Sequence, residues 1–116
     1  MRPEAPAFLW DACEASKRAV SIASGREVGD YLGEWILQAA VERQLEIIGE
    51  ALKHLRAADP ETAERIPDVH AIIATRNILV HAYAQVDQEK VWEIITGDLP
   101  ALIPVLEALL SEVEAQ

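Results

Sequence analysis

The sequence predicts an all-α protein, an up-and-down bundle of four to five helices built as one domain over residues 1–116. Apolar residues recur at steps of three and four along most of the chain, which is the spacing of one helix face. Hydrophobic residues make up 51% of the chain, but aromatic residues only 5%. Ala, Leu, Ile, Glu and Gln are prominent, and this balance favours helices over sheets. A chain of 116 residues also has the usual size of a single domain.

A first helix is expected from about residue 7 to residue 24. Pro3 and Pro6 lie before this stretch and Ser24-Gly25 follows it, as is typical of helix ends. The stretch has one apolar face, because its apolar positions advance by four and three residues at a time. These positions are Phe8, Ala12, Ala15, Ala19 and Ile22.

A long second helix is predicted from about residue 31 to residue 57. It carries two apolar stripes, which favours a central helix that is packed on both sides. One stripe is Val41, Leu45, Ile48, Leu52 and Leu55, and the other is Ile36, Ala40, Ile47 and Ala51. Gly49 lies inside this helix, where glycine costs about 1 kcal/mol relative to alanine, so we expect another helix to approach closely there. Trp35 and Trp92 are expected to be packing residues.

Two aspartates mark helix starts in the middle of the chain. Asp59 is expected to cap a short helical turn that has Pro60 at its first position. This turn ends near residues 66–67. Asp68 is expected to cap the next helix, which ends near residues 85–87.

The last helix is predicted to follow Asp87, which caps it. The apolar spacing of three and four continues from there to the end of the chain. Pro100 and Pro104 interrupt this helix. Because proline removes a backbone donor and disfavours helix in the residue before it, we expect a kink or a break near Leu99.

The charge of the chain limits what it can bind. There are 10 Lys and Arg residues against 20 Asp and Glu residues, which gives a net charge of −10. Proteins that neutralise many phosphates normally present a basic face, so the composition argues against a broad nucleic-acid footprint. An acidic protein can still cleave RNA if two or three basic side chains meet in one cleft. It then binds its substrate locally, or needs a partner.

The sequence also predicts where the protein works. Cys13 is the single cysteine, so no internal disulfide forms, which fits a reducing compartment. No secretory signal is visible after Met1. We find no apolar run that approaches the roughly 20 residues of a membrane-spanning helix. The prediction is a soluble cytoplasmic protein without membrane contact.

Residues 76–83 carry four polar side chains on an otherwise apolar helical stretch: Arg76, Asn77, His81 and Tyr83. Together they bind a phosphate, orient it, move a proton and offer a hydroxyl. This pattern resembles the signature of HepT-like toxins in the HEPN superfamily, small all-α ribonucleases with an Arg-x4-6-His motif. Residues 45–51, with the sequence Leu-Glu-Ile-Ile-Gly-Glu-Ala, resemble the second recurring stretch of that family. With residues 86–87 and 91–92 the match spans roughly two-thirds of the chain.

The resemblance implies an HEPN-like fold and the toxin half of a toxin–antitoxin pair, a metal-independent endoribonuclease. Arg76 and His81 would be its catalytic residues, Asn77 would orient the phosphate or the histidine, and the products would be a 2′,3′-cyclic phosphate and a 5′-hydroxyl. The resemblance also implies that a partner nucleotidyltransferase, the antitoxin, adds AMP to Tyr83. No cofactor is predicted, because the three histidines and the cysteine do not have the spacing of metal ligands.

The spacing of the two catalytic candidates raises a geometric problem. Arg76 and His81 are five positions apart, about 140° around an ideal helix, so they would not touch without help. Either the arginine curls round its helix, or the motifs of two subunits meet across a two-fold axis. The resemblance implies the second arrangement, a homodimer in which paired Arg and His residues line one cleft.

The polar face of the second helix includes Arg43, Glu46, Glu50 and His54. One interpretation is a solvated charged face, whose pairs contribute roughly a few tenths of a kcal/mol each. The other is that Glu46 or Glu50, with Arg43 nearby, supports the arginine or histidine of the motif without contacting substrate. His54 is expected only to be exposed.

Two further interpretations of the motif stay open. Its four polar residues could satisfy one another in a buried network that stabilises a helical dimer. Alternatively, the chain is not an enzyme, and binds nucleotide or nucleic acid or serves only as a partner subunit of a nucleotidyltransferase.

Overall fold

A computed structural model of the chain describes residues 1–81 and 86–114, without the side chains of residues 77, 78, 80 and 81. All regular elements in this part of the chain are helical, which confirms the predicted all-α class. Four long helices and three short ones are described, together with one π-helical turn. They are α1 (Ala5–Ala23), α2 (Val28–Leu32), α3 (Trp35–Ala58), α4 (Pro60–Glu64), α5 (Val69–His81), α6 (Gln88–Glu93), the π-helical turn η2 (Ile94–Asp98) and α7 (Leu99–Glu114).

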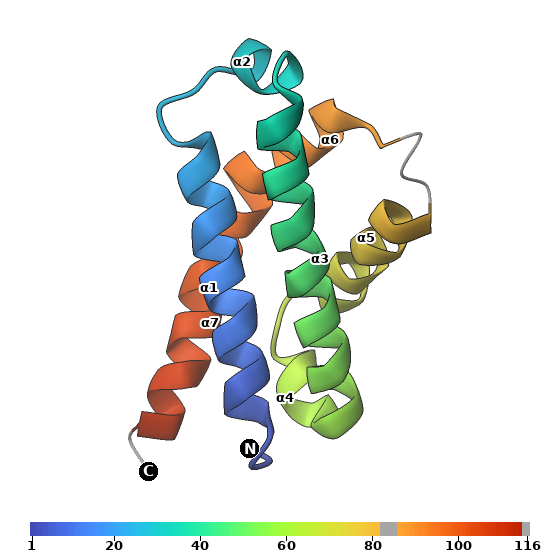
Figure 1. Cartoon of the computed structure of the whole chain (residues 1–116). Helices are drawn as coiled ribbons and strands as arrows, with labels where there is room; N and C mark the ends of the chain where they lie inside the picture. The colour runs from blue at the N-terminus through green and yellow to red at the C-terminus, as the bar shows by residue number, and fades with distance from the viewer. Residues whose placement is uncertain (82–85, 115–116) are drawn as a thin grey trace.

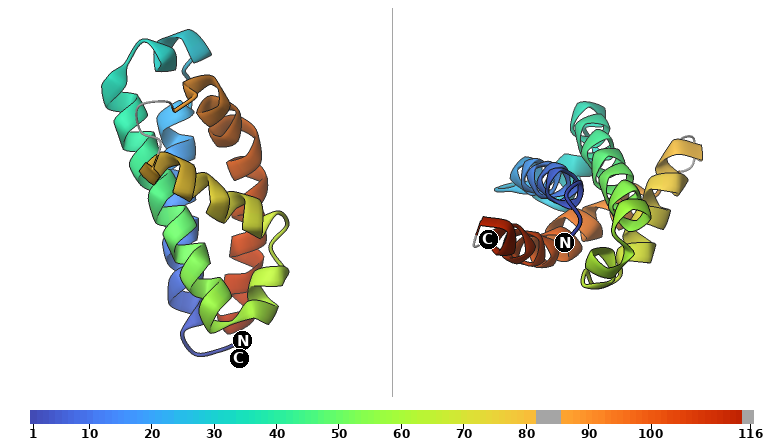
Figure 2. Two further views of the ribbon diagram at one scale, coloured as in Figure 1. Left: turned by 90° about the vertical axis from the view of Figure 1, so that its right-hand side faces the viewer. Right: turned by 90° about the horizontal axis from the view of Figure 1, so that it is seen from below.

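The long helices form an up-and-down bundle. In Figure 1, α1 runs upward and packs against both α3 and α7, which run downward. α5 packs on α3 and crosses it obliquely (Figure 2). The short helices α2 and α6 lie at the top of Figure 1, whereas the N-terminus and the end of α7 lie together at the bottom. α3 is therefore the central helix, with α1 on one side and α5 on the other.

The core lies where the predicted apolar faces of α1, α3 and α7 meet. The first predicted stripe of α3 is buried along its whole length, from Val41 to Leu55. Small residues dominate the buried face of α1, and they let its backbone come close to α3 and α7. The buried residues of α1 are Ala5, Leu9, Ala12, Cys13, Ala15, Ser16, Ala19 and Ala23. Four leucines of α7 complete the core: Leu99, Leu102, Leu106 and Leu109.

The start of the long helix differs from the prediction. It begins at Trp35 instead of near Tyr31, because a separate short helix, α2, precedes it. Side-chain caps of Glu27 and Asp30 start this short helix, and the chain turns at Gly33 before α3 begins. Tyr31 is thus placed in α2, where it is fully buried and donates a hydrogen bond of 2.7 Å from its hydroxyl to Oε1 of Gln88.

The second predicted stripe of α3 is only partly buried. Ala51 is buried, but Ile36 is 59% exposed and Ala40 is exposed as well. Trp35 is 73% exposed, so its predicted packing role is wrong for the single chain. Trp92 does pack, since its ring centroid lies 5.4 Å from that of Tyr31. The start of this stripe is exposed and its end is buried because α5 covers only the C-terminal half of α3 (Figure 1).

Asp59 caps α4 with Pro60 at the first position, as predicted. Its buried carboxylate accepts hydrogen bonds from the hydroxyl of Thr62 at 2.6 Å, the backbone N–H of Thr62 at 3.2 Å and the backbone N–H of Arg2 at 2.8 Å. These bonds, the one from the Thr62 hydroxyl first, hold the pKa of Asp59 below its usual range. The carboxylate therefore ties the N-terminus of the chain to the start of α4.

We expect Asp59→Ala to lower the free energy of unfolding by about 1–2 kcal/mol at pH 7, because a buried cap is lost. The pKa of Asp59 is lower in the folded chain than in the unfolded chain. Its stabilisation is therefore complete above about pH 5 and declines as the pH falls below about 4. Urea unfolding at pH 7 and pH 3 should show the difference between wild type and variant shrinking at pH 3. Glu61→Ala, at an exposed position of the same helix, is the control and should show neither effect.

The helix boundaries around the motif agree with the prediction where they are described. α5 begins directly after Asp68, whose carbonyl accepts the first helical hydrogen bond, from the N–H of Ile72 at 3.0 Å. Asp68 has a φ of 59°, a left-handed conformation that aspartate tolerates better than most residues. Asp87 caps α6 by accepting hydrogen bonds from two backbone N–H groups. The predicted end of the motif helix near Gln85 lies outside the described residues.

The predicted break near Leu99 is a π-helical turn. Residues 88–114 form one helical run, and η2 ends immediately before Leu99. Among the described residues this run alone is long and apolar enough to cross a membrane, which corrects the expectation that no apolar segment reaches that length. Length and composition are weak evidence, since the core helix of a soluble protein meets the same criterion. Four leucines of α7 are buried in the core, and 28% of the apolar window is buried within the single chain.

Candidate active site

The candidate site begins at the crossing of α3 and α5. A Cβ atom placed on Gly49 would lie 2.2 Å from Cβ of Arg76 and 2.8 Å from its Cγ, far inside van der Waals contact. The backbone of α3 and the side-chain stem of Arg76 can therefore touch only because residue 49 is glycine. This confirms the close helix approach that Gly49 predicted. It also fixes where along α3 the motif arginine lies.

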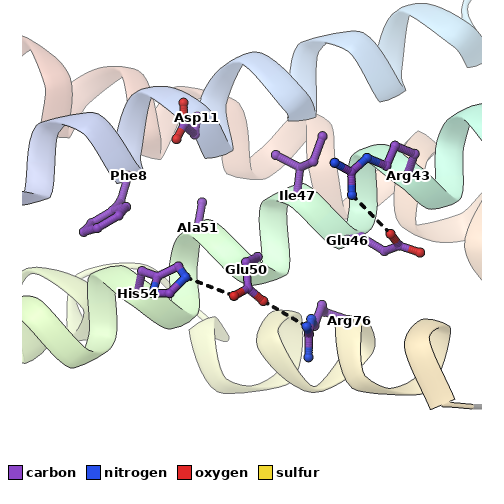
Figure 3. A pocket seen from close by; sticks show the side chains of 9 residues that line it. All are labelled: Phe8, Asp11, Arg43, Glu46, Ile47, Glu50, Ala51, His54 and Arg76. Carbon is purple, nitrogen blue, oxygen red and sulfur yellow. Dashed lines mark hydrogen bonds and ion pairs between the residues drawn. The ribbon is translucent and has the colours of Figure 1, made fainter.

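Glu50, the residue after Gly49, and His54, about one helical turn further along α3, extend the contact. Nη2 of Arg76 lies 3.0 Å from Oε2 of Glu50, and Nε2 of His54 lies 2.9 Å from Oε1 of the same carboxylate. The imidazole of His54 stacks on the ring of Phe8 from α1, with 5.6 Å between ring centroids and 23° between planes. Figure 3 shows Glu50 between the two basic side chains. Side chains from α1, α3 and α5 are thus connected in one row.

A cavity of about 370 Å³ lies beside this row. Its charged lining is mixed, with two arginines and a histidine facing three carboxylates, and Phe8, Ile47 and Ala51 supply apolar surface. The charged residues are Asp11, Arg43, Glu46, Glu50, His54 and Arg76 (Figure 3). A cavity with this lining is not a general phosphate groove. Such a lining suits the local binding of a phosphate group by one or two oriented basic side chains.

The structure separates the two glutamates that the sequence left as alternatives. Glu50 contacts Arg76 of the motif, whereas Glu46 pairs with Arg43 at 3.5 Å on the surface of α3. Both pairs line the same cavity. Of the two glutamates, Glu50 is therefore the one that contacts Arg76, whereas Arg43 and Glu46 form another part of the cavity wall.

The remaining predicted site residues are placed only in part. Asn77 and His81 lie in α5 with Arg76, and α5 is described as a regular helix up to His81. The side chains of both lie outside the described structure, and so does the whole of Tyr83. Arg76 is the only residue of the predicted motif whose side chain is described; it is 23% exposed.

His54 is the residue that sequence reasoning missed. Its side chain is 54% exposed, as expected, but it is held by two contacts instead of pointing freely into solvent. The four-residue spacing from Glu50 was a signal for one of these contacts. The other contact joins residues 8 and 54, and no local pattern in the sequence indicates it.

No set of three or more His, Cys, Asp or Glu side chains in residues 1–81 and 86–114 could hold a metal ion. The absence of a cofactor stays a prediction.

Comparison with known proteins shows what the chain resembles. The family described as "Ribonuclease HepT-like" matches residues 12–109. "Probable ribonuclease HepT" of Thermococcus cleftensis is 36% identical, over 88% of this chain and 92% of that protein. Two proteins of Methanocaldococcus jannaschii, "Putative RNase MJ1380" and "Putative RNase MJ0127", are each 30% identical, over 83% and 95% of this chain and 87% and 90% of their own length. None of the solved structures gives a significant match.

Proposed function

The chain belongs to the ribonuclease HepT-like family, and from this premise we propose that it is an endoribonuclease that cuts RNA without a metal ion, with Arg76 and His81 as catalytic residues. The observation that carries the proposal is the placement of Arg76. Its stem is wedged against Gly49 and its guanidinium is paired with Glu50 at the wall of a cavity. A group that must meet a phosphate in one geometry needs such support.

The proposed reaction is attack by the ribose 2′-hydroxyl on the neighbouring phosphorus. His81, whose unperturbed pKa lies near 6.5, takes the proton from the 2′-oxygen or gives one to the departing 5′-oxygen. The guanidinium of Arg76 binds the phosphate oxygens and stabilises the charge that develops on them. Asn77 orients the imidazole or the phosphate. The O5′–P bond breaks as the O2′–P bond forms, which leaves a 2′,3′-cyclic phosphate and a 5′-hydroxyl.

We propose that two chains complete one site. Positions 76 and 81 on the regular helix α5 are about 140° apart around its axis, so one chain does not present both to the same phosphate without distortion. A second chain would bring its own arginine and histidine into the cleft. It would also double the local positive charge, which a chain with a net charge of −10 needs.

An apolar groove beside α5 supports pairing with a second chain. α5 packs on α3 but not closely on α7. A cavity of about 370 Å³ lies between α5 and α7. Apolar residues contribute much of its lining: Leu45, Ile48, Ile72, Ile94, Leu99, Leu102 and Val105. The exposed Trp35 and Ile36 lie at the start of α3. Burial of this apolar surface would favour the association of two chains. Light scattering of the protein as it elutes from a size-exclusion column should then give the mass of a dimer.

The direct test is digestion of a labelled RNA oligonucleotide in EDTA. We expect cleavage in EDTA, new ends that carry a cyclic phosphate, and no cleavage of a DNA oligonucleotide of the same sequence, because DNA lacks the attacking 2′-hydroxyl. Cleavage of the DNA, or dependence on an added divalent cation, would contradict the proposed reaction. If the purified chain cuts no RNA at all, it acts as a binding module or a partner subunit.

We further propose that the protein is the toxin of a toxin–antitoxin pair and that a nucleotidyltransferase antitoxin inactivates it by adding AMP to Tyr83. The α-phosphate of ATP would be attacked by the Tyr83 hydroxyl, with loss of pyrophosphate. An AMP group near Arg76 would compete with the substrate phosphate and reduce the positive charge of the site.

Intact-mass measurement tests the modification. Protein co-expressed with the proposed nucleotidyltransferase partner should show AMP-sized increments, and Tyr83→Phe should show none while keeping its ribonuclease activity in the presence of the partner. Tyr31→Phe is the matched control at the other tyrosine, which is buried, and should be modified like wild type. Increments that persist in Tyr83→Phe would place the modification elsewhere.

A further inference from the structure

We propose that His54 is a positioning residue for Arg76: acting through Glu50, it fixes the orientation in which the guanidinium meets substrate. This inference rests on the proposed role of Arg76 in cleavage. His54 does not contact Arg76 directly. It contacts the carboxylate that does, and a ring from a third helix holds it there.

The first argument is the way the Glu50 carboxylate is shared. Oε1 lies 2.9 Å from Nε2 of His54, and Oε2 lies 3.0 Å from Nη2 of Arg76. Both are ion-pair distances, so each oxygen of the Glu50 carboxylate faces one basic side chain. The carboxylate cannot rotate without separating at least one of these two contacts. Removal of the His54 imidazole takes away one of them, so the carboxylate can turn and the guanidinium of Arg76 can shift with it.

The second argument is that the imidazole is itself held in place. His54 lies on the exposed side of α3, where a histidine ordinarily samples several rotamers. Its ring stacks on Phe8 of α1, at 5.6 Å between centroids and 23° between planes. Phe8, His54, Glu50 and Arg76 therefore form a positioning row. This row runs from α1 through α3 to α5 (Figure 3). Because α1 and α3 pack along most of their length, the row connects Arg76 to the rigid part of the bundle.

A second histidine in the same protein provides a matched control. Nε2 of His70 lies 2.9 Å from Oε1 of Glu64, and its Nδ1 lies 2.9 Å from Nη1 of Arg56. This group has the same residue types as the positioning row, but none of its members lines the cavity that contains Arg76. A general effect of losing a histidine–carboxylate pair would appear at His70 as well. An effect that acts through Arg76 would appear at His54 and not at His70.

Two substitutions at position 54 separate the polar contact with Glu50 from the ring contact with Phe8. His54→Leu keeps an apolar side chain against Phe8 but removes the donor. His54→Gln removes the ring but keeps an N–H donor that reaches a glutamate four residues earlier on a helix. Both residues favour helix and position 54 is exposed, so both variants should fold. His70→Leu is the control.

The first measurement is the NMR signal of the Arg76 Nε–H group, assigned by its loss in Arg76→Lys. We expect His54→Leu to shift and broaden this signal, and His54→Gln and His70→Leu to leave it close to its wild-type position. The measurement does not need an active enzyme, so it tests the positioning even if the chain cuts no RNA. A signal unchanged by His54→Leu would overturn the inference.

The second measurement is RNA cleavage under saturating and limiting substrate. We expect His54→Leu to lower kcat roughly ten-fold with little change in KM, because a misplaced arginine affects the transition state most. His54→Gln should recover most of this loss. Equal loss in both variants would mean that the ring, not the polar contact with Glu50, is needed, and would sink the proposal.

A double-mutant cycle tests whether His54 acts through Glu50. In a Glu50→Gln background, His54→Leu should have little further effect on kcat or on the Arg76 signal. Additive effects would show that His54 acts independently, against the inference. The proposed function fails separately, if Arg76→Ala cleaves RNA as well as wild type does.

Discussion

Arg76→Ala and His81→Ala are each expected to reduce RNA cleavage at least about 100-fold, the largest effect we predict for any single substitution. In the proposed reaction, Arg76→Ala would remove the charge that stabilises the phosphate in the transition state. His81→Ala would remove the group that moves the proton. The rate of cleavage of a labelled RNA in EDTA, at saturating substrate, is the measurement, with circular dichroism to show that each variant is folded.

Arg56→Ala and His70→Ala are the matched controls for these two variants. They remove the same residue types from a surface group that does not line the cavity, and both should cleave RNA like wild type. Loss of activity in the controls would indicate a general effect of charge or stability. Full activity in both Arg76→Ala and His81→Ala would leave the motif as a structural network of a helical dimer.

Mixing the two inactive variants tests the shared cleft. A heterodimer of Arg76→Ala and His81→Ala, isolated with two affinity tags, keeps one intact arginine and one intact histidine on different chains. If the site is formed across the two-fold axis, this heterodimer should regain cleavage that neither homodimer has. If each chain carries its own site, the heterodimer stays inactive, and the proposed pairing of chains is wrong.

Gly49→Ala should be destabilising although it adds a single methyl group. The new Cβ would lie 2.2 Å from Cβ of Arg76, so α5 must move away from α3 or the arginine must leave its position. Overpacking of this kind costs about 1–3 kcal/mol, and the helix propensity of alanine offsets about 1 kcal/mol of that cost, so we expect a net loss of up to about 2 kcal/mol. The displaced arginine should also lose activity beyond the loss of stability, measured well below the melting temperature.

Gly29→Ala is the control for this substitution. Gly29 is also in a helix, but a Cβ there would meet no atom within 4 Å. It should be neutral or slightly stabilising and leave cleavage unchanged. A Gly49→Ala variant with wild-type stability and activity would contradict the close contact of α3 and α5 at Arg76.

The apolar spacing of the sequence predicted most of the bundle, because the burial of one helix face leaves a local and periodic trace. The stripe from Val41 to Leu55 is buried as expected, and so are the leucines of α7. The errors lie where a boundary or an exposure depends on distant residues. Tyr31 was expected to start the long helix, but it closes a separate helix against Gln88, 57 residues away. Trp35 was expected to pack, and no helix of the described chain covers it.

In the candidate site, too, local features were predictable from the sequence and contacts between distant residues were not. The sequence by itself predicted which residue types would carry the chemistry and that a helix approaches Gly49, because both predictions rest on single residues and short spacings. Only the tertiary structure decided that this helix is α5, that Glu50 and not Glu46 meets Arg76, and that His54 joins them. The reason is physical: the angle and register at which α5 crosses α3 follow from the packing of the whole bundle, and a register shift of one turn would give Arg76 a different partner.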